Sequence, residues 1–112
     1  MDPVSQYFSD QLHNKLSGII NEIVLFGSRA RGDNTAGSDY DFLVVLEKRD
    51  KQIVRVIRDI EVDILNKFDI LSASLIYNVS EWEQRQGFPI GMNIQKEGIW
   101  LWPRKKSRSM PS

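Results

Sequence analysis

Two carboxylates at the start of an apolar segment are the side chains of this 112-residue chain best placed to do chemistry. Asp39 and Asp41 flank Tyr40 and lead into Phe42-Leu43-Val44-Val45-Leu46, a run that predicts a buried strand. Side chains two apart in a strand share a face, so the two carboxylates are expected side by side, with Tyr40 pointing away. Such hard oxygen ligands suit Mg²⁺ or Mn²⁺, which leave positions open for phosphate oxygens.

The segment before this pair contains groups that can hold phosphate. The apolar run 23–26 predicts a strand ending at Gly27, where the missing side chain lets backbone N–H groups approach an anion. Ser28 adds a hydroxyl, and Arg29 and Arg31 can add charge-assisted contacts. The pattern predicts a triphosphate held against metal ions. The alternative is a solvated strand start, with the arginines in solvent or paired to a carboxylate such as Asp33.

Several other kinds of site are excluded. Gly27 and Gly32 have the GxxxxG spacing, but Asp33-Asn34 stands where the Walker motif requires Lys and Ser or Thr. No GxGxxG segment occurs, which argues against a Rossmann dinucleotide site. The chain has no Cys, so it can form no disulfide framework, thiolate metal site or Cys nucleophile.

The remaining segments predict the elements that position these groups. Apolar residues at helical spacing predict helices, and apolar runs bounded by turn residues predict strands. A capping-box pattern at Ser80 and Glu83 predicts one more short helix, and Gly98 ends a final helical turn. The order predicts an α/β (α+β) fold class, a small mixed sheet with helices packed on it. The predicted helices cover 5–20, 49–66, 80–86 and 93–97, and the predicted strands cover 23–26, 40–47, 68–77 and 99–102.

Composition predicts one domain over residues 1–103 and a basic tail over 104–112. Hydrophobic residues at 41% and charged residues at 27% argue against disorder. The formal net charge of zero argues against a broadly basic nucleic-acid-binding protein. No apolar run approaches the roughly 18–20 residues of a membrane span, and no signal-peptide pattern opens the chain. The sequence therefore predicts a soluble, cytoplasmic protein with no membrane partner.

The motif as a whole resembles that of a known superfamily. Gly27-Ser28, ten residues, then Asp39-x-Asp41 resembles the signature of the DNA polymerase β-like nucleotidyltransferases. The segment FGSRARG…SDYDFLV resembles the minimal nucleotidyltransferase (MNT) branch of this superfamily. The segment FPIGMNIQKEGIWLW is similar to the C-terminal end of many MNT proteins. The resemblance spans residues 20–102 and implies the polymerase β-like palm fold.

The resemblance also assigns roles to residues. It implies that Asp39 and Asp41 bind two divalent ions, Mg²⁺ or Mn²⁺, and that Gly27 and Ser28 hold the phosphates of a nucleotide. It implies a third carboxylate on the next strand, which serves as a catalytic metal ligand.

The third carboxylate has two candidates in this chain. Lys67-Phe68-Asp69-Ile70-Leu71 resembles the family strand that carries it, so Asp69 is the prediction. Asp63 is the competitor, but it lies within a helical pattern.

The implied activity is transfer of a nucleoside monophosphate, AMP from ATP, to a hydroxyl of a macromolecular acceptor. MNT proteins are commonly paired with HEPN-domain toxins, and in some pairs the MNT antitoxin adds AMP to a toxin tyrosine. Two alternatives stay open. One is a non-catalytic nucleotide- or partner-binding module, and the other is nucleotidyl transfer to RNA or to a small molecule.

The residues outside the motif predict mostly packing. His13 lies off the apolar face of the first helix and is expected at the surface. Trp82, Trp100, Trp102 and Phe88 are expected in the core or at a sheet edge, the alternative being a nucleobase or partner surface. The Ile/Trp segment near the end makes a homodimer or hetero-oligomer plausible.

Overall fold

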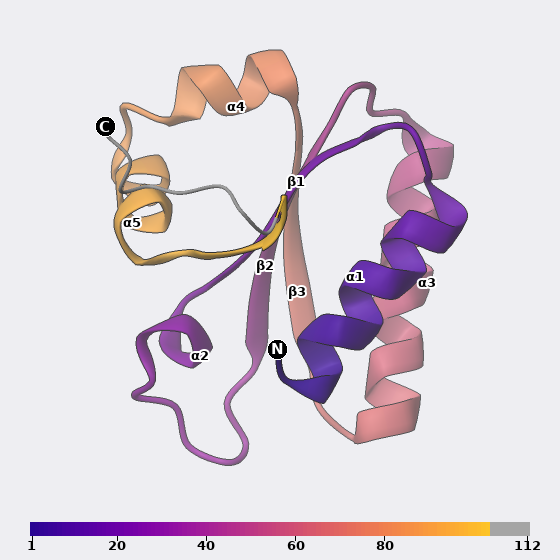
Figure 1. Ribbon diagram of the computed structural model, residues 1–112, viewed down its shortest axis with the longest axis vertical. Helices are drawn as coiled ribbons and strands as arrows, with labels where there is room; N and C mark the ends of the chain where they lie inside the picture. The colour runs from indigo at the N-terminus through magenta and orange to yellow at the C-terminus, as the bar shows by residue number, and fades with distance from the viewer. Residues whose placement is uncertain (104–112) are drawn as a thin grey trace.

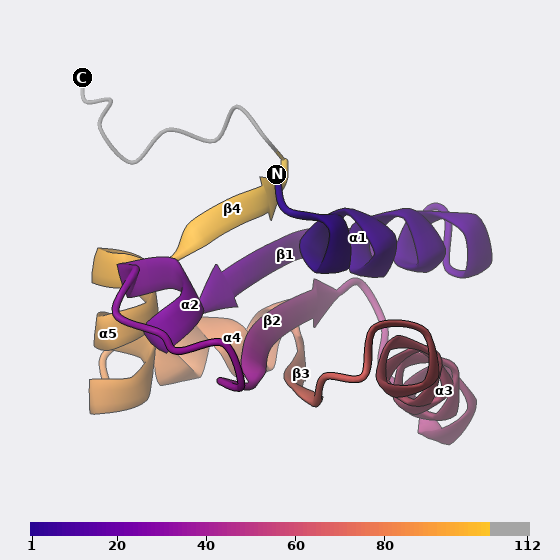
Figure 2. The same ribbon diagram turned by 90° about the horizontal axis from the view of Figure 1, so that it is seen from below.

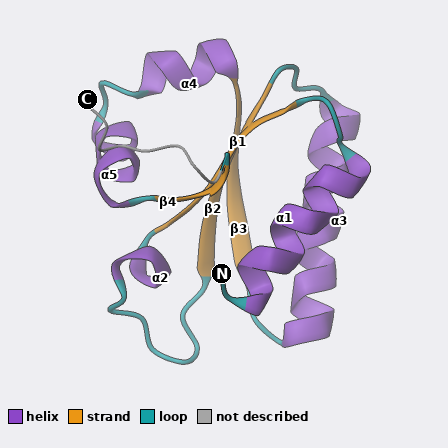
Figure 3. Cartoon of the chain, viewed as in Figure 1, coloured by secondary structure: helices purple, strands orange, loops and turns teal. Residues whose placement is uncertain are grey.

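The computed structural model describes residues 1–103, which form a four-stranded sheet with helices on both faces (Figure 1). β1 runs antiparallel to both β2 and β4, whereas β2 and β3 are parallel. The predicted mixed α/β fold is confirmed (Figure 3). The strand order is β3-β2-β1-β4, with β1 at Ile20–Phe26, β2 at Tyr40–Leu46, β3 at Ser72–Asn78 and β4 at Ile99–Trp102.

The helices divide between the two faces of the sheet, as Figure 2 shows. Because strand side chains alternate between faces, β2 contributes side chains to two hydrophobic cores, one on each face of the sheet. Every residue from Phe42 to Leu46 is fully buried, which is why that run is apolar without alternation. One face is covered by α1 (Pro3–Lys15) and α3 (Lys51–Phe68), and the other by α4 (Val79–Arg85) and α5 (Pro89–Glu97), beside the short α2 (Ser28–Arg31).

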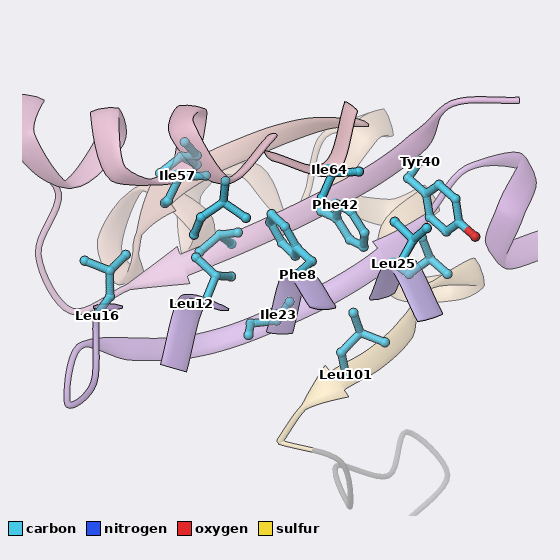
Figure 4. Packing of buried hydrophobic residues seen from close by; sticks show 14 of the residues in the cluster. Phe8, Leu12, Leu16, Ile23, Leu25, Tyr40, Phe42, Ile57, Ile64 and Leu101 are labelled. Atoms are coloured by element: carbon cyan, nitrogen blue, oxygen red, sulfur yellow. The ribbon is translucent and has the colours of Figure 1, made fainter. Parts of the chain in front are cut away.

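The larger core lies under α1 and α3 (Figure 4). Phe8 of α1 stacks on Phe42 of β2 with ring centroids 4.0 Å apart, and both rings are fully buried. The buried residues Ile57, Ile60 and Ile64 of α3 recur at helical spacing on the same side. This packing fixes β2, the strand whose start carries the two carboxylates.

Several predicted boundaries are wrong. The first helix ends at Lys15, and β1 begins at Ile20, earlier than its apolar run. Residues 89–97 form a full helix because Pro89 suits the first helical position.

The segment before β3 differs most from its prediction. α3 continues through Phe68, and β3 begins only at Ser72. Asp69 caps α3 in the left-handed conformation (φ 56°, ψ 42°), with its N–H donating to the carbonyl of Leu65. Asp is among the few residues that tolerate this conformation, so the helix pattern extends where a strand was predicted.

The aromatic predictions are confirmed in part. Trp82 is 3% exposed and fills the smaller core under α4 and α5, whereas Phe88 is 54% exposed. His13 is half-buried, contrary to its prediction, because its ring packs edge-on against Trp102 at 4.7 Å between centroids. Its Nδ1 also lies 2.8 Å from the carbonyl oxygen of Ser9.

Two further predictions concern the ends of the chain and the membrane. The predicted basic tail 104–112 lies outside the described residues. Within residues 1–103, no helix combines the length and apolar character that crossing a membrane requires.

Candidate active site

The turn after β1 begins with a glycine in a conformation that other residues rarely adopt. Gly27 has φ 78° and ψ −159°, a region that is essentially restricted to glycine. Its carbonyl accepts hydrogen bonds from the N–H groups of Ala30 and Arg31, both at 3.0 Å. These bonds start α2, so the strand passes directly into a helical turn at Ser28.

Asp41 lies directly beside this glycine. Residue 41 is the partner of Phe26 in the β1–β2 ladder, and a Cβ added to Gly27 would collide with the Asp41 carboxylate. Tyr40 is only 5% exposed and points into the larger core (Figure 4). The predicted alternation is therefore confirmed at Tyr40. Asp39 is exposed and immediately precedes β2, and Asp41 is half-buried within it.

The electrostatic balance at Asp41 is unfavourable to its charged form. Burial raises the pKa of Asp41, the negative charge of Asp39 raises it further, and the Arg31 guanidinium partly opposes both. Within residues 1–103, no side chain forms an ion pair or a hydrogen bond with the Asp41 carboxylate. A divalent cation would supply the missing positive charge, so the donor set of the pair fits Mg²⁺ or Mn²⁺.

The predicted third carboxylate does not join this pair. Residues 1–103 contain no group of three His, Cys, Asp or Glu side chains that could hold a metal ion. Asp69 is exposed at the end of α3, before β3 begins, and Asp63 is exposed on α3 itself. The structure therefore does not bring Asp69 together with Asp39 and Asp41, and its role as a third metal ligand stays a prediction.

The sheet register places Ala73 of β3, and not a carboxylate, beside Asp41. Asp41 pairs with Ala73 of β3, and paired residues of neighbouring strands face the same side of the sheet. Ala73 is exposed and offers no ligand atom. The site is a carboxylate pair next to an open position.

Arg29 makes contacts within its own loop, and its predicted phosphate contact stays a prediction. Its Nε and Nη2 donate to the carbonyl of Ser38 at 3.1 and 2.9 Å, and Nη2 also donates to the carbonyl of Ala36 at 3.1 Å. The guanidinium carbon lies 4.4 Å from the centroid of the Tyr40 ring, and Nη1 lies 3.4 Å from its hydroxyl. The guanidinium is thus bound to the segment that carries Asp39.

Arg31 is the more available cation. Its Nε lies 3.1 Å from Asp33 Oδ2 and its Nη1 lies 3.3 Å from Glu97 Oε1. The Arg31 side chain is 43% exposed, and surface ion pairs of this kind are worth about 0–1 kcal/mol. A phosphate could therefore displace these partners.

Sequence reasoning missed three features of this site. The pairing of Asp41 with Ala73 depends on where β3 begins, which the apolar pattern placed too early. The stacking of Arg29 on Tyr40 could have been anticipated, since the predicted alternation turns Tyr40 inward. The contact of Arg31 with Glu97 joins residues 66 positions apart, and no sequence pattern signals it.

Comparisons with known proteins agree on one family and one fold. Residues 7–101 match the family described as the nucleotidyltransferase domain. A Methanocaldococcus jannaschii protein, named provisionally as a protein adenylyltransferase, is 29% identical over 95 residues, covering 85% of this chain and 91% of that protein.

Two solved structures have the same fold at lower sequence identity. A toxin–antitoxin with AMP-PNP matches with a TM-score of 0.62 and 18% identity, over 88% of this chain and 72% of that one. A variant of the MntA-HpeT toxin–antitoxin matches with a TM-score of 0.59 and 17% identity, over the same shares of both chains.

Proposed function

Because the chain belongs to the nucleotidyltransferase domain family, we propose that it transfers AMP from ATP to a hydroxyl of a macromolecular acceptor. The observation that carries the proposal is the Asp41 carboxylate lying against the Gly27 backbone, with Asp39 and Ser28 beside them. This arrangement brings a metal-binding pair and a phosphate-binding turn together.

Each residue then has a chemical role. Asp39 and Asp41 would hold the divalent ions, which would supply positive charge to the phosphate oxygens. The backbone at Gly27 and the Ser28 hydroxyl hold the phosphates, and Arg31 can leave its surface partners to join them. The acceptor oxygen attacks the α-phosphorus, and the bond between the α-phosphorus and the pyrophosphate oxygen breaks. The acceptor's proton passes to solvent or to a phosphate oxygen.

The acceptor we propose is a tyrosine hydroxyl of a HEPN-type toxin, so that the chain acts as an antitoxin. The support is the name of the Methanocaldococcus jannaschii relative, which describes a protein adenylyltransferase, and the two toxin–antitoxin structures with the same fold. An acceptor that brings its own binding surface also suits the described residues 1–103, which form one four-stranded sheet and the helices packed on it.

The test is transfer of label from α-³²P-ATP with Mg²⁺, with and without the protein encoded beside this chain. Label on that protein, lost in Asp39→Asn and Asp41→Asn, is the expected result. Asp59→Asn is the matched control, because Asp59 is an exposed carboxylate on α3, away from the pair. Label on RNA or on a small molecule would contradict the protein acceptor and leave the transferase activity standing.

A second function is favoured by one observation, the absence of a carboxylate at Ala73. A protein with two metal ligands and no third acid could bind nucleotide and its partner without turnover. That reading predicts no label on any acceptor, with any of the four nucleotides or with Mn²⁺. It also predicts that Asp41→Asn leaves partner binding intact.

A further inference from the structure

We infer that Arg29 is a positioning residue, which holds Asp39 beside Asp41 by clamping the two residues that flank Asp39. This inference rests on the proposed function for its consequence at the metal site, but the clamp itself stands on contacts within the chain.

The Arg29 side chain contacts the loop on both sides of Asp39. On the N-terminal side, two N–H groups of Arg29 converge on the carbonyl of Ser38 at 2.9 and 3.1 Å. On the C-terminal side, the guanidinium stacks on the Tyr40 ring at 4.4 Å. Residue 39 is therefore fixed between two neighbours that the same side chain contacts.

The C-terminal grip is anchored in the core. The Tyr40 ring is 5% exposed and stacks on the Phe42 ring, with centroids 5.9 Å apart and an interplanar angle of 19°. The Tyr40 N–H also donates to the carbonyl of Leu71 at 3.0 Å. Arg29 thus ties the loop to a buried ring of the larger core.

The loop would hold Asp39 poorly without this tie. Residues 32–39 form turns and irregular structure between α2 and β2, and six of the eight are exposed. Asp39 and Asp41 also carry like charges two residues apart in the chain, so their carboxylates repel one another. Without a restraint, repulsion and chain entropy would both move Asp39 away from its partner.

The geometry requires an arginine and leaves little of it for a ligand. Four hydrogen bonds engage the guanidinium, to Ser38 twice, to Ala36 and to the Tyr40 hydroxyl. A guanidinium has five N–H donors in a fixed plane. A lysine ammonium has no plane to stack on the ring while it also reaches two carbonyls.

The experiment compares Arg29→Lys with Arg58→Lys in the full chain. Arg58 is the matched control because its guanidinium also donates to a backbone carbonyl, that of Ser74 at 3.2 Å, but it lies on α3, away from the carboxylate pair. Two readouts are measured, hydrogen exchange of peptides covering residues 33–40 and Mn²⁺ affinity without nucleotide.

The expected result is faster exchange of residues 33–40 in Arg29→Lys and a loss of Mn²⁺ affinity of about 10- to 100-fold, the range for residues that orient metal ligands. Arg58→Lys should change neither readout. Thermal melting separates a loss of fold from a loss of position, since a positioning role leaves the exchange of the core strands unchanged.

The outcomes that overturn the inference are distinct. Unchanged exchange over residues 33–40 in Arg29→Lys would show that Arg29 does not restrain the loop. Faster exchange with unchanged Mn²⁺ affinity would show that this restraint does not affect metal binding. An increased KM for ATP with normal exchange and Mn²⁺ affinity would make Arg29 a phosphate ligand instead. If the wild-type chain binds no Mn²⁺, the proposed function fails as well, and the exchange result reports the clamp independently.

Discussion

The carboxylate of Asp41 lies so close to the backbone of Gly27 that a methyl group at residue 27 would collide with it. The contact joins the end of β1 to the start of β2, across the register pair of Phe26 and Asp41. One glycine therefore serves both halves of the proposed site. It allows the positive φ of 78° that starts the turn proposed to bind phosphate, and it leaves the space that the Asp41 carboxylate, a proposed metal ligand, occupies.

Gly27→Ala should abolish nucleotidyl transfer and lower the stability of the chain. The backbone conformation alone costs about 1–3 kcal/mol for a residue with a Cβ, and the collision displaces Asp41 in addition. Thermal melting and label transfer from α-³²P-ATP measure the two effects.

Two glycines of the same loop are matched controls for that variant. Gly32 has a φ of 85° but nothing within 4 Å of an added Cβ, so Gly32→Ala should show the strain without the collision. An added Cβ on Gly37 meets neither obstacle, so Gly37→Ala should behave as wild type. Equal transfer activity in Gly27→Ala and Gly32→Ala would show that the contact with Asp41 is irrelevant.

Asp41→Asn should stabilise the chain at neutral pH in the absence of divalent ions. The pKa of Asp41 is raised above its ordinary value of 3.8 by burial and by Asp39, so the folded state binds the proton more tightly than the unfolded chain does. The resulting penalty is absent below the ordinary pKa and complete above the raised one. The melting temperature of the variant should exceed that of wild type at pH 7, and the difference should vanish below about pH 3.

Divalent ions provide the check on that explanation. Mg²⁺ or Mn²⁺ should raise the melting temperature of wild type and have little effect on Asp41→Asn, because the ion binds only the folded carboxylate pair. A wild type that is more stable than the variant at pH 7 without metal would contradict the assigned direction of the pKa shift.

The parts of this molecule that sequence predicted well are those in which local pattern and tertiary packing agree. The run from Phe42 to Leu46 is apolar because both faces of β2 are covered, and its strand was therefore unambiguous. The tight turn at Gly27 and Ser28 could be predicted because a glycine that ends an apolar strand has few other structural uses. The inward direction of Tyr40 followed from the two-residue period of a strand.

The parts that sequence predicted badly depend on where one element gives way to another. Residues 68–71 are apolar enough for a strand, but Phe68 ends α3, the N–H of Asp69 caps it through the carbonyl of Leu65, and residues 70–71 form the connection to β3. Asp69 was therefore assigned to the wrong element, and the register that places Ala73 beside Asp41 was invisible. The contacts of Arg29 within its loop were not predicted, because its acceptors are backbone carbonyls, which no sequence pattern reveals.

Phe8→Ala should destabilise the fold without altering the chemistry of the folded molecule. Phe8 is fully buried and stacks on Phe42, one residue from Asp41, and such truncations cost about 3–5 kcal/mol. Denaturant unfolding should show that loss, while activity per folded molecule at low temperature stays close to wild type. A loss of activity in molecules that remain folded would show that α1 packing positions β2 more finely than the strand pairing does.

Ala73→Asp should create the third metal ligand that the described residues do not supply. Ala73 is exposed, pairs with Asp41 and faces the same side of the sheet, so an aspartate there adds a carboxylate without burying it. We expect roughly tenfold tighter Mn²⁺ binding, since affinity for hard cations rises with the number of charged ligands. Ala73→Asn is the matched control, because it adds the same volume without the charge. If both variants bind Mn²⁺ as wild type does, the register position beside Asp41 lies outside the metal site. Tighter binding by Ala73→Asp alone would show that a carboxylate at residue 73 can join Asp39 and Asp41 as a third metal ligand.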